Sequence, residues 1–311
     1  MKTINPSIFH PAGWLPLLLF SLNVTASPIV VPFQLAGNSI VVRASVNGVA
    51  GNFLFDTSSP DVLLNSARFQ GFPCEKYSEA TDIHGNIPVT LCFSVKELKL
   101  GESELPWRRQ FVPVLDLRNL EAVKGMHLHG IFGHSAFRAF AVMIDFESQE
   151  LTLFPLGKNG DYTSGEPLFS PSSSYDLEMC GHIPAVIIHW KGKALRMGID
   201  TGSEINVFDA SALERKGLSI YATDSVVIRA ISKHRLIAPA GFAEGISLSD
   251  WQPEMVQVVV ADLSHIHDSI SSQLDGVLGV PFFKKGKMAI NYKRKKLNLW
   301  RTDDASLARV K

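Results

Sequence analysis

Short runs in which apolar and polar residues alternate are the dominant pattern of this chain, and they predict β-strands. Residues 39–46 form one such run, which meets the turn-forming pair Asn47-Gly48 before residues 49–55 return alongside it. The second half of the chain repeats this arrangement at residues 183–199. We therefore expect an antiparallel hairpin at a corresponding place in each half.

A second hairpin is expected later in each half, from residues 141–146 with 151–154 and from residues 288–292 with 297–300. Helical periodicity is scarce, and only one short helix is indicated, ending within residues 213–217. Short strands joined by Gly-rich turns are typical of a barrel or a sandwich. The pattern predicts an all-β protein.

Two phrases occur twice in the chain, and their separation is nearly the same in each copy. Residues 53–59 read FLFDTSS, and residues 197–203 read MGIDTGS. The later phrase HGIFG ends at Gly133, and its counterpart DGVLG ends at Gly279. A repeat of this length predicts two copies of one folding unit, related by a pseudo-two-fold axis that brings the repeated aspartates together.

The repeat divides the chain into two lobes, which we expect at residues 28–156 and 176–303. Residues 157–175 between them are rich in Gly, Ser and Pro, as is typical of a linker. At 311 residues, with 46% hydrophobic and 19% charged residues, the composition suits a soluble two-domain protein. Lys+Arg and Asp+Glu number 30 each, so the net charge gives no reason to expect nucleic acid as a partner.

Residues 1–26 differ from the rest of the chain. Lys2 precedes an apolar stretch at residues 14–22, and residues 24–26 (VTA) offer the small side chains at which a signal peptidase cuts. The stretch is too short for a membrane span, and no later segment reaches the eighteen or so apolar residues that a span requires. We expect an exported protein, periplasmic or secreted, with no stable membrane insertion after signal cleavage. The alternative, a first strand of the fold, is disfavoured by Pro16.

The three cysteines leave two interpretations open. In an oxidising compartment, Cys74 and Cys92 of the first copy form a disulfide and Cys180 stays free. Alternatively, all three are buried thiols that pack as small hydrophobic groups.

The repeated Asp-Thr-Gly-Ser pattern is suited to acid–base chemistry by two carboxylates. An apolar strand carries the aspartate to a site with little water, and a following Gly lets a backbone N–H point at the carboxylate. The Thr hydroxyl can bond to the opposite loop, and the Ser hydroxyl can donate to the outer carboxylate oxygen. Two carboxylates at about 3 Å cannot both ionise and therefore share one proton. The charged member takes a proton from a bridging water while its partner protonates a peptide carbonyl oxygen, with no metal, cofactor or covalent intermediate.

These phrases resemble the active-site loops of the aspartic proteases, the pepsin and retropepsin group. The stretches IFG and VLG, ending at Gly133 and Gly279, resemble the apolar-apolar-Gly segment that threads through each active-site loop of that family. The chain is similar to a fused retropepsin-like dimer, and the resemblance covers nearly all of the mature chain. It implies two retropepsin-like or pepsin-like β-barrel lobes. It also implies an aspartic endopeptidase that acts on polypeptides, and the built-in pseudo-dimer favours a monomer. The site residues that it implies are the catalytic pair Asp56 and Asp200, with Thr57, Ser58, Ser59, Thr201, Gly202 and Ser203 supporting them.

The first copy departs from the family pattern at one position. Ser58 stands where the family has Gly, and a Cβ there is costly if the backbone needs positive φ. It could also turn the backbone amide away from Asp56. This departure leaves a second hypothesis, a non-catalytic peptide-binding or inhibitory protein with an aspartic-protease fold.

A flap should close over the substrate in such a fold. Residues 81–88 are the candidate in the first lobe and residues 229–241 in the second. We favour the first, because His84, Gly85 and Asn86 make a mobile tip.

Closely spaced histidines raise the question of a metal site. His127 and His129, followed by His134, have the spacing of metal ligands, and His265 with His267 repeats it. Residues two apart share a face of a strand, so such a pair could bind zinc. However, His129 is the counterpart of Asp275, a position that suits a turn, and no Cys or Glu completes a tetrahedral set. We predict no metal.

Overall fold

The computed structural model describes residues 27–70, 74–82, 85–92, 95–107, 111–164, 167, 170–229, 231 and 235–301. The predicted signal segment and His84 of the predicted flap tip lie outside these residues.

Strands make up most of both halves. Those of the first half are β1 (Ile29–Ala36), β2 (Ser39–Val46), β3 (Val49–Phe55), β4 (Leu63–Asn65), β5 (Cys74–Asp82), β6 (Gly85–Cys92), β7 (Leu98–Leu100), β8 (Ser103–Glu104), β9 (Val112–Leu115), β10 (Gly130–Phe132), β11 (Phe140–Asp145) and β12 (Glu150–Pro155). Those of the second half are β13 (Ser173–Asp176), β14 (Glu178–Cys180), β15 (Ile183–Trp190), β16 (Lys193–Ile199), β17 (Asn206–Asp209), β18 (Tyr221–Arg229), β19 (Arg235–Glu244), β20 (Ile246–Ser247), β21 (Met255–Ala261), β22 (Gly276–Leu278), β23 (Gly286–Asn291) and β24 (Lys296–Arg301). The helices are short: α1 (Arg118–Lys124), α2 (His134–Phe137), α3 (Ala210–Lys216), α4 (Ser264–Ile270) and α5 (Val280–Phe283).

The two halves share the same order of paired strands, so the fold is all-β with two lobes. In the first lobe the order is β2-β3-β10-β4-β9, and in the second it is β15-β16-β22-β17-β21. In each lobe the strand that leads into the aspartate, β3 or β16, pairs in parallel with the strand of the Gly phrase, β10 or β22. The strand that leads into the aspartate therefore has the same neighbouring strands in both lobes.

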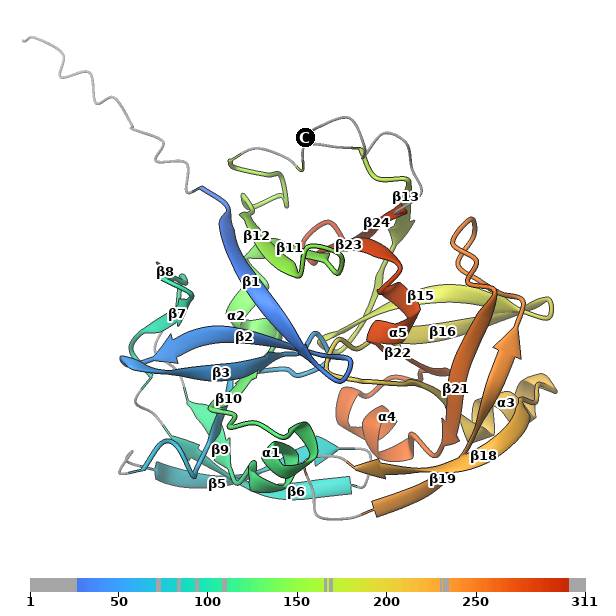
Figure 1. Ribbon diagram of the computed structural model, residues 1–311, viewed down its shortest axis with the longest axis horizontal. Coiled ribbons are helices and arrows are strands. Elements are labelled where there is room, and N and C mark those ends of the chain that lie inside the picture. The colour runs from blue at the N-terminus through green and yellow to red at the C-terminus, as the bar shows by residue number, and fades with distance from the viewer. Residues whose placement is uncertain are drawn as a thin grey trace, which may run out of the picture.

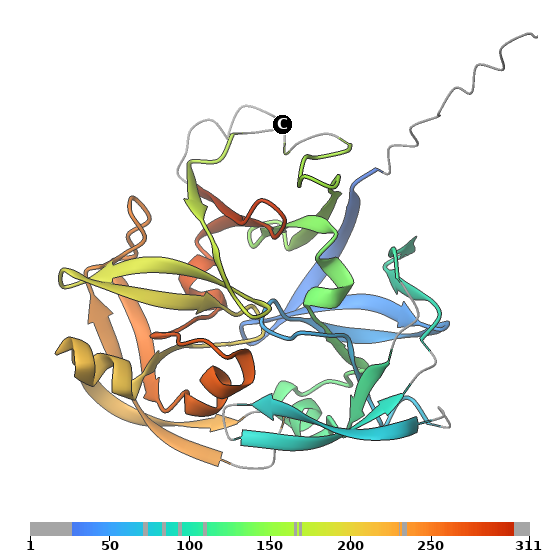
Figure 2. The ribbon, with the colours of Figure 1, turned by 180° about the vertical axis from the view of Figure 1, so that it is seen from behind.

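A sheet that both lobes build holds them together. Strand β11 of the first lobe pairs antiparallel with β23 of the second, with Val142 opposite Ile290. The sheet continues outward through β12 and β1 on one side and through β24 and β13 on the other. Figure 1 shows this sheet above the two lobes, and Figure 2 shows it from behind. The last residues of the predicted linker already belong to β13, because Ser173 pairs with Leu299 of β24.

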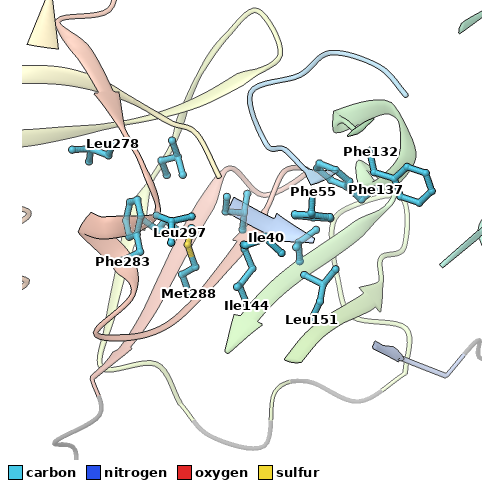
Figure 3. Close-up of a cluster of buried hydrophobic side chains, with 14 of the residues drawn as sticks. Ile40, Phe55, Phe132, Phe137, Ile144, Leu151, Leu278, Phe283, Met288 and Leu297 are labelled. Carbon is cyan, nitrogen blue, oxygen red and sulfur yellow. The ribbon is translucent and has the colours of Figure 1, made fainter. Parts of the chain in front are cut away.

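The hydrophobic core also crosses from one lobe to the other. One cluster of buried side chains includes Phe55 and Phe137 of the first lobe and Phe283 of the second. In Figure 3, Ile144 of β11 and Met288 of β23 lie within it, and these two residues are register partners. A continuous core and a continuous sheet fix the two aspartate loops relative to each other.

The local predictions agree closely with the described elements. The first predicted hairpins have the expected turns, since Asn47 and Gly48 have φ of 50° and 79° and Lys191 and Gly192 have 48° and 74°. Both central residues at positive φ are what a two-residue hairpin turn of this kind requires. The predicted helix is α3, which ends at Gly217 in the left-handed conformation. The other helices have at most seven residues, too few for periodicity to reveal. Within the described chain, no helix has the length and apolar character needed to cross a membrane.

Candidate active site

The two candidate catalytic aspartates occupy equivalent places. Each directly follows a buried apolar strand end, Asp56 after β3 and Asp200 after β16. The backbone N–H of Asp56 donates to Phe132 O at 3.0 Å, and that of Asp200 donates to Leu278 O at 3.0 Å. Both acceptors belong to the Gly phrases, so each phrase anchors the aspartate of its own lobe.

The glycines of the two phrases are required by close packing against these loops. A Cβ on Gly133 would stand 2.4 Å from Asp61 O, and one on Gly279 would stand 2.4 Å from Ile205 O. Contacts this short exclude any side chain. The Gly phrase therefore passes directly behind the aspartate loop in both lobes.

Two buried threonines bond the loops to each other. The backbone N–H of Thr57 donates to Thr201 Oγ1 at 3.0 Å, and that of Thr201 donates to Thr57 Oγ1 at 3.0 Å. The hydroxyls in turn donate to Ile199 O at 2.9 Å and Phe55 O at 3.0 Å. Four hydrogen bonds thus cross the pseudo-two-fold axis in the pattern that the sequence predicted for the threonines.

The inner oxygen of each carboxylate accepts backbone hydrogen bonds from its own loop. Asp56 Oδ1 accepts from Ser58 N at 2.7 Å and Ser59 N at 3.0 Å. Asp200 Oδ1 accepts from Gly202 N at 2.9 Å and Ser203 N at 3.1 Å. The expectation that a Cβ at position 58 turns its amide away is therefore wrong. Neither Ser58 nor its counterpart Gly202 stands at positive φ, so the Cβ adds no backbone strain here.

The serine hydroxyls at the loop ends do not reach the outer carboxylate oxygens, contrary to our expectation. Ser59 Oγ donates to Asp61 O at 3.1 Å, and Ser203 Oγ donates to Ile205 O at 2.8 Å. Each hydroxyl donates to a carbonyl of its own turn, so both stabilise their own loops.

The carboxylate of Asp56 lies against the opposite loop. A Cβ on Gly202 would stand 2.4 Å from Asp56 Oδ2, so only glycine leaves room for this approach. Both aspartates keep a partial opening to solvent, and protein atoms surround Asp200 on its other sides. Burial first, and the charge of Asp56 second, raise the pKa of Asp200 to about 8. The Asp56 carboxylate is thus near enough for its charge to act on Asp200.

This raised pKa predicts how stability depends on pH. An unfolded aspartate has a pKa near 3.9, so between about pH 4 and pH 8 the folded state holds a proton that the unfolded state lacks. The resulting stabilisation is complete below about pH 4 and is lost as the pH rises through 8. We expect the melting temperature of Asp200→Asn to exceed that of the wild type increasingly from pH 5 to pH 8. Parallel melting curves across this range would contradict the raised pKa of Asp200.

A turn in each lobe contacts the aspartate loop of the other lobe. Asn38, between β1 and β2, donates from Nδ2 to Glu204 O at 3.0 Å. The Glu204 carboxylate also pairs with the nearly buried Lys124 at 2.8 Å. In the second lobe, His182 between β14 and β15 lies with Nε2 2.5 Å from Ser58 O. Sequence reasoning missed these contacts, although Asn38 and His182 stand at equivalent places before the hairpins of the repeat.

Two hairpins, β5–β6 and β18–β19, reach from one lobe to the other (Figures 1 and 2). Helix α4 of the second lobe lies against β5 and β6, and a Cβ on Gly85 would stand 3.7 Å from the His265 ring. Ile231, next to β18, packs on a first-lobe cluster that includes Val41 and Leu54. The hairpin favoured as the flap and its second-lobe counterpart thus make comparable contacts. Of the predicted flap tip, Gly85 and the backbone of Asn86 are described.

The histidines that raised the question of a metal have other surroundings. His127 contacts Arg68 at 2.5 Å and the carboxylate of Glu121 at 3.6 Å. His129 packs against Phe53 and Phe69, and His267 Nε2 lies 2.8 Å from Leu274 O. Across the described ranges, no three His, Cys, Asp or Glu side chains gather where they could bind a metal ion.

The cysteines of the first lobe face each other by register. Cys74 of β5 and Cys92 of β6 are direct backbone partners in their hairpin. Their side chains lie outside the described part of the structure, so the disulfide stays a prediction, whereas Cys180 is buried and free.

Part of the chain matches a known protein family. Residues 185–282 match the family described as aspartyl protease. This segment contains Asp200, Thr201, Gly202 and Gly279, the loop and the Gly phrase of the second lobe. No curated protein matches the chain.

Proposed function

We propose that this chain, as a member of the aspartic protease superfamily, is an exported endopeptidase. In this proposal, it hydrolyses peptide bonds within polypeptides by means of a water molecule activated by Asp56 and Asp200. One observation carries the proposal. Two equivalent loops, joined by four hydrogen bonds of Thr57 and Thr201, hold the carboxylates together, and the pKa of Asp200 is raised to about 8.

The reaction follows from a pair that holds one proton. The ionised carboxylate takes a proton from water as the water oxygen bonds to the peptide carbonyl carbon. The protonated carboxyl gives its proton to the carbonyl oxygen, which forms a neutral tetrahedral diol. In the second step, one hydroxyl of the diol returns a proton to a carboxylate, the amide nitrogen takes a proton from the other carboxyl, and the C–N bond breaks. The pair ends with one proton, as it began.

The two hairpins that contact the opposite lobe, β5–β6 and β18–β19, support a polypeptide as the substrate. An extended chain can pair with strand edges through its backbone, which suits an enzyme that recognises polypeptides. Because β5–β6 and β18–β19 each contact the opposite lobe, both are proposed as flaps. The built-in second lobe supports a monomer.

Export is supported by the apolar segment within residues 1–26. N-terminal sequencing of the protein recovered from the periplasm or the medium tests this point. A chain that still begins at Met1 would contradict signal cleavage.

The function itself is tested by incubating the protein with an unfolded polypeptide from pH 3 to pH 8. We expect a bell-shaped profile, whose alkaline limb reflects loss of the shared proton and whose two limbs belong to the pair. A peptide in which a hydroxyl-bearing tetrahedral carbon replaces the scissile bond should block cleavage, because it imitates the diol. Binding of this peptide without any cleavage would instead support the non-catalytic peptide-binding hypothesis.

A further inference from the structure

Within the Asp-Thr-x-Ser segments the two loops differ at one position, and this difference places a hydroxyl beside Asp56. In the second loop, Gly202 lies so close to Asp56 that no Cβ fits. In the first loop, the equivalent residue is Ser58, and its Oγ donates to Asp56 Oδ1 at 2.8 Å. The hydroxyl carries one hydrogen, and this hydrogen is given to Asp56; on the pKa of Asp200 the hydroxyl has a lowering effect that is smaller than the raising effects of burial and of the Asp56 charge.

This hydroxyl makes the surroundings of the two carboxylates unequal. Asp56 Oδ1 accepts three hydrogen bonds, from the backbone N–H and the hydroxyl of Ser58 and from the backbone N–H of Ser59. Asp200 Oδ1 accepts two, from the backbone N–H groups of Gly202 and Ser203. Hydrogen bonds to a carboxylate favour its ionised form, so the third bond favours negative charge on Asp56.

We propose that Ser58 is a positioning residue whose hydroxyl holds the negative charge on Asp56 and leaves the shared proton on Asp200. This inference rests on the proposed peptidase function and assigns the two roles within it. Asp56 is the base that accepts the proton of the attacking water, and Asp200 is the acid that protonates the carbonyl oxygen.

The orientation of Ser58 is secured from the other lobe. His182 Nε2 lies 2.5 Å from Ser58 O, and because a carbonyl oxygen only accepts, this nitrogen carries the hydrogen. Burial lowers the pKa of His182, which favours the neutral ring. The peptide of Ser58 is thereby held at its carbonyl by His182 and at its N–H by Asp56.

Other titratable groups surround the pair and must be held constant in a test. Asp61 and His182 lie near Asp56 and Ser58. Behind the first loop, burial lowers the pKa of His134 to about 4, and burial with the charge of Asp56 raises that of Tyr292. Since none of these groups changes when Ser58 is substituted, the difference between a variant and the wild type isolates the serine.

The test compares Ser58→Ala, which removes only the hydroxyl, with Ser58→Gly, which also removes the Cβ. The matched control is Ser211→Ala in α3, because Ser211 Oγ also donates to an aspartate, Asp209 Oδ1, at 2.5 Å. For each protein, the pH dependence of kcat/KM and of the melting temperature is measured. Without the hydroxyl, the first ionisation of the pair becomes harder. We expect the acid limb of kcat/KM to move up by about one pH unit in both Ser58 variants and to stay in place in the control.

The melting temperature provides a measurement that does not need activity. The hydroxyl stabilises the ionised pair, so the deficit of Ser58→Ala relative to the wild type should be small in acid and should grow as the pH rises through the first ionisation. A merely structural role would give the same deficit at every pH and would leave the acid limb unmoved.

Two results would overturn the inference. One is an unchanged acid limb together with a pH-independent melting deficit in Ser58→Ala. The other is a shift in Ser58→Gly alone, which would assign the effect to the Cβ. If the wild type cleaves no polypeptide at any pH, the proposed function fails, and the melting comparison still decides the role of Ser58.

Discussion

Asp200→Asn is expected to lower kcat/KM for polypeptide cleavage by at least about a thousandfold. The asparagine side chain has nearly the same shape, but it cannot hold and transfer the proton that the pair shares. Asp56→Asn should have a comparable effect, because one carboxylate acts as base while the other acts as acid. Initial rates on an unfolded polypeptide at the optimum pH measure both variants.

The matched control for these variants is Asp176→Asn. Asp176 is exposed and pairs with Lys296 at 2.7 Å on the surface, so its loss should leave the rate at the wild-type level. Retention of more than a few per cent of turnover in either Asp56→Asn or Asp200→Asn, with the fold intact, would exclude a mechanism that needs both carboxylates.

Thr201→Val should destabilise the protein by about 2–4 kcal/mol and lower its melting temperature by several degrees. Valine has the same shape but lacks the hydroxyl, which accepts from Thr57 N at 3.0 Å and donates to Phe55 O at 3.0 Å. Thr201 is only 1% exposed, so no water can replace the lost hydroxyl as the partner of Thr57 N–H and Phe55 C=O. Cleavage should also weaken, because the hydroxyl fixes one loop against the other.

Two further variants separate this effect from the substitution itself. Thr201→Ser keeps the hydroxyl and should retain most of the stability. Thr163→Val removes an exposed hydroxyl that donates to Pro155 O at 3.1 Å, and it should change stability by less than about 0.5 kcal/mol. If Thr201→Val left melting temperature and activity unchanged, the bonds between the loops would have no energetic importance.

Much of the fold could be predicted from the sequence, because the pattern that specifies a strand lies in neighbouring residues. The predicted runs at residues 39–46, 49–55 and 183–190 coincide with β2, β3 and β15. The later hairpins agree to within one or two residues. The internal repeat added long-range information, since two copies of one unit imply two equivalent aspartate loops.

Within the candidate site, prediction succeeded where a residue type has one plausible partner and failed where several acceptors compete. A buried Thr at the axis can bond only to the opposite loop, and Thr57 and Thr201 do so. The hydroxyls of Ser59 and Ser203 had a choice, and each bonds to a carbonyl of its own turn. That choice depends on the three-dimensional path of the turn, which residue order alone does not specify.

By itself, the sequence determined the all-β character, the two-fold repeat and the pair of aspartate loops, because alternation and repetition are properties of the linear chain. Only the tertiary structure decided that β11 and β23 join the lobes in one sheet, that His182 contacts Ser58 O, and that the Ser58 hydroxyl donates to Asp56. These contacts join residues that are far apart along the chain or lie on opposite lobes. They exist because the docking of the two lobes sets the distance between groups that no local pattern relates.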